Sequence, residues 1–295
     1  MRMMNRRHAL KTLAATALAP LAAQAANTRF KISLAEWSIH RAIQSRKLTN
    51  LDFPKVAHDF GIEGLEFVNQ LWGAPTQGYI KQLKKRMNDN GCKGVLIMCD
   101  DEGAMGHSKQ PERMRAADNH IKWLDAAADL GCHSIRVNMY PDNEDKQPPN
   151  VDTFVGYCAE SFTKLCGYAK DRNLNVIIEN HGGVSSDADV LVKLMKAVNL
   201  PNFGLLPDFG NFGPKQDRFE SVRKMLPYSK GVSFKCFDFG PDGKETRFDM
   251  DKMMKIVAES NYKGYVGIEY EGDKTPEMEG IAAGKKYLDK FFATL

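Results

Sequence analysis

The stretch NVIIENHGGVSSDADVLVKLMKAVNLPNFGLLPDFGN, residues 175–211, contains one complete strand–helix–strand unit. Its two apolar runs, 175–180 and 203–208, are short and rich in large aliphatic side chains, as is typical of strands covered on both faces. Between them, residues 187–198 carry apolar side chains at helical spacing, and Asp187 supplies a helix-start signal. Because two parallel strands need a long crossover connection, the stretch predicts a parallel strand pair joined by a helix.

The same unit recurs on both sides of this stretch. Short apolar runs predict eight strands, at 30–37, 63–68, 93–99, 134–139, 175–180, 203–208, 231–237 and 265–270. The segments between and after them predict helices at 51–60, 78–89, 111–130, 152–172, 187–198, 217–226, 250–260 and 276–292. Eight such pairs predict a single-domain α/β fold, the (β/α)₈ TIM barrel, over residues 29–293. A doubly wound open sheet is the alternative, but no GxGxxG motif follows the first strand.

The first 25 residues differ from the rest in composition. MRMMNRRHALKTLAATALAPLAAQA combines four basic and no acidic side chains with an Ala-rich apolar run that ends in the small-x-small sequence Ala23-Gln24-Ala25. This order is typical of a secretory signal peptide, and the apolar run is too short to span a bilayer. The pair Arg6-Arg7 resembles a twin-arginine signal. We therefore expect export to the periplasm, and no membrane attachment after the signal is removed.

Charge argues against nucleic acid as a partner. The whole chain has 41 basic and 37 acidic side chains, and loss of the four in the signal leaves equal numbers. No basic patch then remains to neutralise phosphates. None of the six cysteines forms a CxxC pair, so we expect buried free thiols, although an exported protein could form disulfides. The sequence leaves a homo-oligomer open.

Acidic and polar residues gather where the predicted strands end, which in a TIM barrel is the face that carries the active site. Three carboxylates, Glu179, Asp208 and Glu269, end strands five, six and eight. Buried carboxylates cost several kcal/mol unless they are paired or bind a metal. The sequence therefore predicts a divalent metal site (Mn, Mg, Co or Zn) on these three residues, with salt bridges to Arg136 and Lys235 as the alternative.

These residues carry a family resemblance. The runs IIENHGG (177–183) and YKGYVGIEYEG (262–272), supported by PDFGN (207–211) and SIRVN (134–138), resemble the xylose isomerase-like TIM barrel superfamily. This group is often labelled sugar phosphate isomerases/epimerases and includes the AP endonuclease family 2-like proteins. The resemblance covers about residues 29–293.

The resemblance implies roles for individual residues. Glu179 and Glu269 match the glutamates that bind the metal and act as the acid/base pair, and Asp208 matches a third ligand. Ser233 stands where the family usually has a His or Gln ligand, and Asn211 stands where a His often follows the aspartate. Because of these departures, Lys235 or His181 could supply part of the charge stabilisation, and we include both as catalytic candidates. The side chains expected to contact a sugar are Trp37, Glu66, Arg136, Asn138, Asn211 and Glu271.

We therefore expect an exported sugar isomerase or epimerase that acts on a small carbohydrate by proton transfer beside a carbonyl. A metal or Lys235 would stabilise the enediolate that forms. Two alternatives remain open: a keto-sugar (3-keto-glycoside) lyase or dehydratase on the same site, and a non-catalytic sugar-binding barrel. Endonuclease activity is excluded because the chain lacks a basic groove and sufficient histidines.

Overall fold

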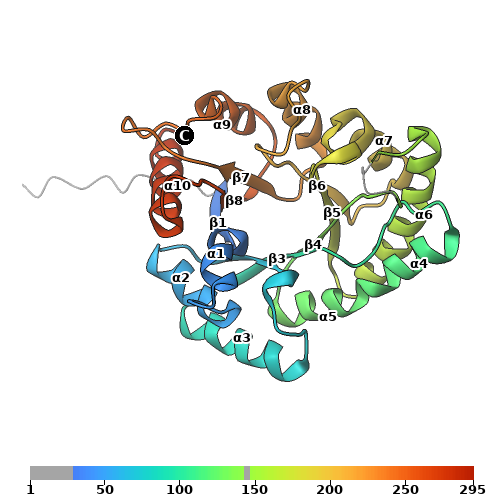
Figure 1. Ribbon diagram of the computed structural model, residues 1–295, viewed down its shortest axis with the longest axis horizontal. Helices are drawn as coiled ribbons and strands as arrows, with labels where there is room; N and C mark the ends of the chain where they lie inside the picture. Colours follow the sequence, from blue (N-terminus) through green and yellow to red (C-terminus); the bar gives the residue numbers. More distant parts are fainter. Residues whose placement is uncertain (1–28, 143–146) are drawn as a thin grey trace, which may run out of the picture.

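The computed structural model describes residues 29–142 and 147–295. Its eight strands form one sheet of parallel neighbours in the order β6-β5-β4-β3-β2-β1-β8-β7, and helices surround the sheet (Figure 1). The strands are β1 (Phe30–Ala35), β2 (Gly64–Val68), β3 (Lys93–Cys99), β4 (Ser134–Val137), β5 (Asn175–Glu179), β6 (Phe203–Leu206), β7 (Val232–Cys236) and β8 (Gly264–Tyr270). This arrangement confirms the single-domain (β/α)₈ barrel.

The ring closes between β6 and β7 through isolated bridges rather than a regular ladder. Leu205 pairs with Ser229, and Asp208 pairs with Ser233 beyond the end of β6. Backbone hydrogen bonds run from Ser233 N to Pro207 O at 2.9 Å and from Phe209 N to Ser233 O at 3.3 Å. These bridges and hydrogen bonds therefore set the distance between Asp208 and Ser233 at the strand ends.

The α-helices are α1 (His40–Gln44), α2 (Phe53–Asp59), α3 (Gln77–Asp89), α4 (Gln110–Asn119), α5 (Ile121–Leu130), α6 (Val151–Lys170), α7 (Ala188–Val198), α8 (Arg218–Met225), α9 (Met250–Glu259) and α10 (Glu277–Phe292). Short 3₁₀ helices are η1 (Glu36–Ile39), η2 (Asn50–Asp52), η3 (Asn69–Leu71), η4 (Gly183–Ser186) and η5 (Leu226–Tyr228). No helix in the described part of the chain is long and apolar enough to cross a membrane.

The prediction of one helix over 111–130 is wrong, because α4 ends and α5 begins at His120. The His120 ring is buried, and its Nδ1 lies 2.7 Å from the Ala116 carbonyl oxygen. A side chain that occupies this carbonyl competes with the regular backbone bond of the helix. The His120 amide turns instead to Ala117 O, one residue later.

Apolar side chains fill the barrel on both sides of the sheet. The large core lies between the sheet and its helices, and a smaller cluster inside the barrel comprises Ala35, Val68, Val95, Leu96, Met98, Ile177 and Leu206. The six cysteines are buried and free, as expected. Residues 1–25, for which the sequence predicts a signal peptide, lie outside the described residues.

Candidate active site

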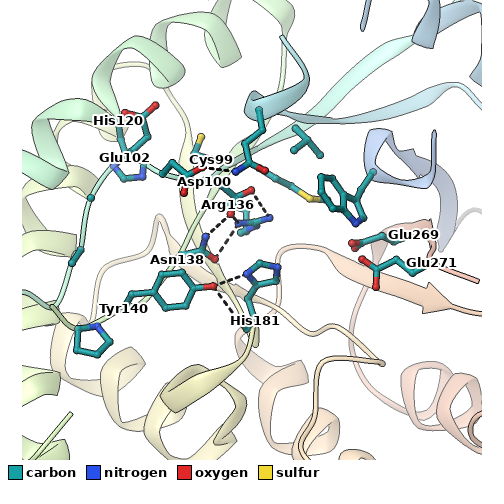
Figure 2. A pocket seen from close by; sticks show the side chains of 18 residues that line it. Cys99, Asp100, Glu102, His120, Arg136, Asn138, Tyr140, His181, Glu269 and Glu271 are labelled. Carbon is teal, nitrogen blue, oxygen red and sulfur yellow. Dashed lines mark hydrogen bonds and ion pairs between the residues drawn. The ribbon is translucent and has the colours of Figure 1, made fainter. Parts of the chain in front are cut away.

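A cavity of about 550 Å³ opens at the end of the barrel where the strands finish. Figure 2 shows Glu269 and Glu271 on one side of it, and Arg136, Asn138 and Asp100 across from them. The wall of the cavity also includes Trp37, Asp101, Gly103, Tyr140, Pro141 and His181. This volume is in the usual range for a small-molecule site.

The three carboxylates predicted to act together do converge. Glu179, Asp208 and Glu269 are buried, and each offers an oxygen that lies within 4.8 Å of the other two. Of the three, only Glu269 lines the cavity itself. The triad, as we call these three residues, therefore forms a buried acidic centre that meets the cavity at Glu269.

Two groups of β7 compensate the charge of the triad. The Lys235 ammonium lies 3.1 Å from Glu269 Oε1 and 3.5 Å from Asp208 Oδ2. The Ser233 hydroxyl lies 2.9 Å from both Asp208 Oδ2 and Glu269 Oε2. Because residues 233 and 235 are two apart on one strand, both side chains face the barrel axis.

Arg136 of β4 compensates the third carboxylate. Its Nε lies 2.9 Å from Glu179 Oε2 as an ion pair without hydrogen-bond geometry, and its Nη1 donates to Asp100 Oδ1 at 2.7 Å. Asn138 also donates to Asp100 and accepts from Arg136 Nη1 at 3.1 Å. A buried guanidinium on β4 therefore links carboxylates at the ends of β3 and β5, the two strands that flank β4, which is a geometry for which arginine is well suited.

Burial and these cations move the pKa values of the triad apart. Burial raises the pKa of Glu179 to about 7, although Arg136 opposes the shift. Burial also raises the pKa of Asp208, against the influence of Lys235. At Glu269, burial is outweighed by Lys235 and by hydrogen bonds from Lys235 and Ser233, so its pKa is lowered. Carboxyl groups with divergent pKa values are the arrangement from which acid and base roles arise.

His181 stands beside the triad and lines the cavity. Burial, and then the nearby Arg136 charge, lower its pKa to about 4, so the imidazole is neutral at neutral pH. Its Nδ1 lies 2.7 Å from the Tyr140 hydroxyl (Figure 2). A neutral imidazole fixed at one nitrogen can offer the other nitrogen to a ligand.

Trp37 lines the cavity at the end of β1. Its indole stacks on the His40 ring, with centroids 4.4 Å apart and an interplanar angle of 9°. The His40 ring is itself held by a 2.6 Å contact between its Nδ1 and the carbonyl oxygen of Trp37. A fixed aromatic face of this kind suits the apolar face of a sugar ring.

Two of the predicted sugar contacts, Glu66 and Asn211, lie outside the wall of this cavity. Glu66 does not line the cavity: it is buried inside the barrel against Gly267, and its Oε1 accepts from Ser33 Oγ at 2.5 Å. Asn211 lines a neighbouring hollow with His181, and its amide nitrogen donates to Glu179 Oε1 at 3.0 Å. Asn211 therefore orients a triad carboxylate. Trp37, Arg136, Asn138 and Glu271 do line the cavity.

Sequence reasoning did not assign roles to Asp100, Asn180 or Tyr140. Asp100 anchors Arg136, Tyr140 anchors His181, and Asn180 holds the backbone of Asp208. Asp100 was visible as an acid at a strand end. Asn180 and Tyr140 gave no sign of these particular roles, because neutral polar residues at or after a strand end are typical of any loop.

The triad fits a divalent cation by its chemistry. Three carboxylates offer the hard oxygen ligands that Mg²⁺ and Mn²⁺ prefer. Glu179 Oε2 is buried and receives no hydrogen bond from any described residue, so a lone pair remains for an ion. Asp208 Oδ1 is oriented by the backbone amides of Gly210 and Asn211, each at 2.8 Å.

Comparison with known proteins agrees with this architecture. Residues 54–291 match the family model described as xylose isomerase-like TIM barrel. Among curated proteins, none matches the chain.

Three solved structures are similar over nearly their whole length. The 3-keto-D-glucoside 4-epimerase from E. coli is 14% identical, with a TM-score of 0.69 over 89% of this chain and 99% of that one. A magnesium complex of a xylose isomerase-like TIM barrel protein from Mycobacterium smegmatis is 15% identical, with a TM-score of 0.67 over 91% and 98%. The probable 3-DHS dehydratase from Bacillus anthracis is 16% identical, with a TM-score of 0.65 over 88% and 98%. At these identities the similarity shows the fold alone.

Proposed function

The chain belongs to the xylose isomerase-like TIM barrel family, and we propose that it is a sugar isomerase or epimerase that moves a proton beside a carbonyl group. One observation carries the proposal. Three buried carboxylates and two buried cations, Lys235 and Arg136, form one charged cluster, and Glu269 and Arg136 connect this cluster to a cavity of suitable size for a sugar. The solved sugar epimerase among the similar structures supports this class of reaction.

We assign the base role to Glu269. It lines the cavity, and its lowered pKa keeps it ionised, so it can accept a proton from the carbon beside the carbonyl. The C–H bond breaks, its proton forms an O–H bond with Glu269, and the electron pair passes to the carbonyl oxygen as an enediolate. Lys235 and Arg136 supply positive charge near that oxygen.

Glu179 takes the acid role once a sugar enters as far as the triad, since this side chain lies beside Glu269 and does not line the cavity itself. Its pKa of about 7 leaves a proton on the carboxyl group in a large fraction of molecules at neutral pH. Return of that proton to carbon completes an epimerisation, or an isomerisation when it is delivered to the neighbouring carbon. His181 and Trp37 then hold the sugar, the first by hydrogen bonding and the second by stacking.

A divalent ion would be held by Glu179, Asp208 and Glu269. When bound, it would polarise a sugar carbonyl as a Lewis acid. The similarity to a structure that contains magnesium supports an ion of this kind.

The direct test is solvent exchange. The purified protein is incubated in D₂O with a panel of free ketoses and keto-glycosides, and deuterium in the recovered sugar is measured by mass spectrometry. We expect deuterium at one carbon beside the carbonyl of at least one sugar. A panel in which every sugar is bound but none exchanges would support a non-catalytic binding barrel instead.

A lyase or dehydratase is the second candidate, since loss of a β-substituent can follow the same proton abstraction. The cavity favours it because its wall includes Asp101, Gly103 and Pro141 as well as Glu269, and its volume of about 550 Å³ is larger than one sugar ring needs. A similar structure is named as a probable dehydratase. Release of the aglycone from a keto-glycoside would identify this reaction, whereas epimerisation leaves the glycoside intact.

We also propose that the protein works in the periplasm, on the grounds of the basic and Ala-rich residues 1–25. Fractionation of cells that produce the full chain tests this. We expect the protein in the periplasmic fraction, and retention in the cytoplasm after Arg6-Arg7 is changed to Lys-Lys.

A further inference from the structure

Lys235 is a buried cation with an unusual set of partners. Its side chain is 2% exposed, and lysine is almost never so deeply buried without a partner. The ammonium lies 3.1 Å from Glu269 Oε1, and 3.5 Å from both Asp208 Oδ2 and Glu271 Oε1. It also donates to Asn211 Oδ1 at 3.2 Å. The nitrogen therefore has four oxygen neighbours, three of them from carboxylates.

Two of those oxygens belong to groups that would hold a divalent ion. Asp208 and Glu269 are two members of the triad, and Asn211 donates to the third, Glu179, at 3.0 Å. The ammonium and a metal ion consequently depend on the same carboxylates. Two cations a few ångströms apart in a buried site repel each other strongly.

Arg136, the other cation of the site, depends less on the triad than Lys235 does. Arg136 contacts Glu179 alone among the three and is anchored on Asp100, outside the triad. An ion could therefore enter beside Arg136 while Arg136 keeps Asp100. Lys235 has a weaker alternative anchor, Glu271, which is partly exposed.

We propose that Lys235 is a cation built into the acidic centre, and that it competes with a divalent ion for Asp208 and Glu269 and so sets the metal affinity of the site. In the absence of metal, Lys235 holds the triad together. On metal binding, its ammonium moves toward Glu271. This inference rests on the proposed metal site of the triad, and it does not depend on which sugar reacts.

The test is a Mn²⁺ titration by calorimetry of protein first stripped of metal. In Lys235→Met the competing ammonium is absent, and we expect Mn²⁺ to bind at least about tenfold more tightly than in the wild type. Lys230→Met is the control. Lys230 is partly buried and lies in the segment before β7, at the opposite end of that strand from Lys235, so its removal should leave the Mn²⁺ affinity unchanged. Unchanged or weaker binding in Lys235→Met would overturn the proposal.

A second variant guards against misfolding and separates competition from simple charge. Lys235→Met/Glu271→Gln removes one positive and one negative charge, so the net charge of the site is kept while the triad is intact. We expect Mn²⁺ to bind this variant more tightly than the wild type and to raise its melting temperature by more than that of the wild type. A double variant that stays unfolded in millimolar Mn²⁺ also contradicts the proposal, because the ion should replace the ammonium.

Failure of this inference differs from failure of the proposed function. Solvent exchange in the wild type, with equal Mn²⁺ affinities of wild type and Lys235→Met, would leave the isomerase assignment standing and remove the competition. Tighter Mn²⁺ binding in Lys235→Met, with no exchange on any sugar, would support the competition and contradict the isomerase assignment.

Discussion

Asn180 holds Asp208 by both of the backbone polar groups of that residue. The Asn180 amide nitrogen donates to Asp208 O at 2.9 Å, and its Oδ1 accepts from the Asp208 N–H at 2.8 Å. Asn69 makes the same pair of bonds to Asp100, at 2.8 and 2.9 Å. Each asparagine follows one strand and fixes the aspartate after the next, so two acidic residues of the site are set by the same side-chain clamp.

Replacing Asn180 with Ala should weaken metal binding. The substitution leaves two buried backbone groups of Asp208 unpaired, which costs about 1–3 kcal/mol of unfolding free energy. Loss of a group that orients a ligand typically costs about 10–100-fold in metal affinity. Asn69→Ala is the matched control: it removes the same bonds from Asp100, and we expect a similar loss of stability with Mn²⁺ affinity unchanged. Equal effects of both variants on affinity would show that the clamp acts only through general stability.

Much of this site was predictable from the sequence because it lies at strand ends. Short apolar runs predicted all eight strands, and the acidic residues at the ends of three of them placed Glu179, Asp208 and Glu269 at one face. The sequence did not predict how deep each inward-facing side chain lies along the barrel axis. The alternation that points Glu66 inward does not say that it lies below the cavity, against Gly267.

The sequence also did not predict which side chains contact one another. The contacts of Lys235 depend on how β6 and β7 close the ring, and isolated bridges at Asp208 and Ser233 make that closure. The break at His120 depends on one side chain that bonds a helix carbonyl. Neither feature changes the hydrophobic pattern on which the prediction depended.

Glu66→Gln should change the pH dependence of stability. Burial raises the pKa of Glu66 from its ordinary value near 4.5 to about 8, against the opposing hydrogen bond from Ser33. A raised folded-state pKa gives stability that is present below pH 4.5 and is lost as the pH rises through 8. A glutamine side chain does not titrate, so we expect the variant to match the wild type at about pH 5 and to exceed it by about 1–3 kcal/mol at about pH 9.

Urea unfolding at about pH 5, 7 and 9 measures this difference. The wild type should lose stability relative to Glu66→Gln across the series. Parallel curves for the two proteins would mean that Glu66 titrates alike in the folded and unfolded chains, and the raised pKa would then be wrong.

Trp37→Ala should weaken sugar binding without a large loss of turnover. Trp37 lines the cavity and stacks on His40, so its removal takes away a contact made equally with substrate and transition state. We expect KM to rise by about 3–10-fold, with kcat nearly unchanged. Trp72→Phe is the control, since Trp72 packs against Trp123 away from the cavity. That variant should lower the melting temperature and leave KM unaltered; the opposite pattern would remove Trp37 from the site.

The most direct test of the proposed chemistry is the rate of solvent-deuterium exchange in Glu269→Gln compared with Glu271→Gln. Both side chains line the cavity and both contact Lys235, but only Glu269 belongs to the triad. We predict that exchange falls by about 10³-fold or more in Glu269→Gln and by less than about tenfold in Glu271→Gln. Exchange in Glu269→Gln within about tenfold of the wild-type rate would contradict the assignment of this carboxylate as the base.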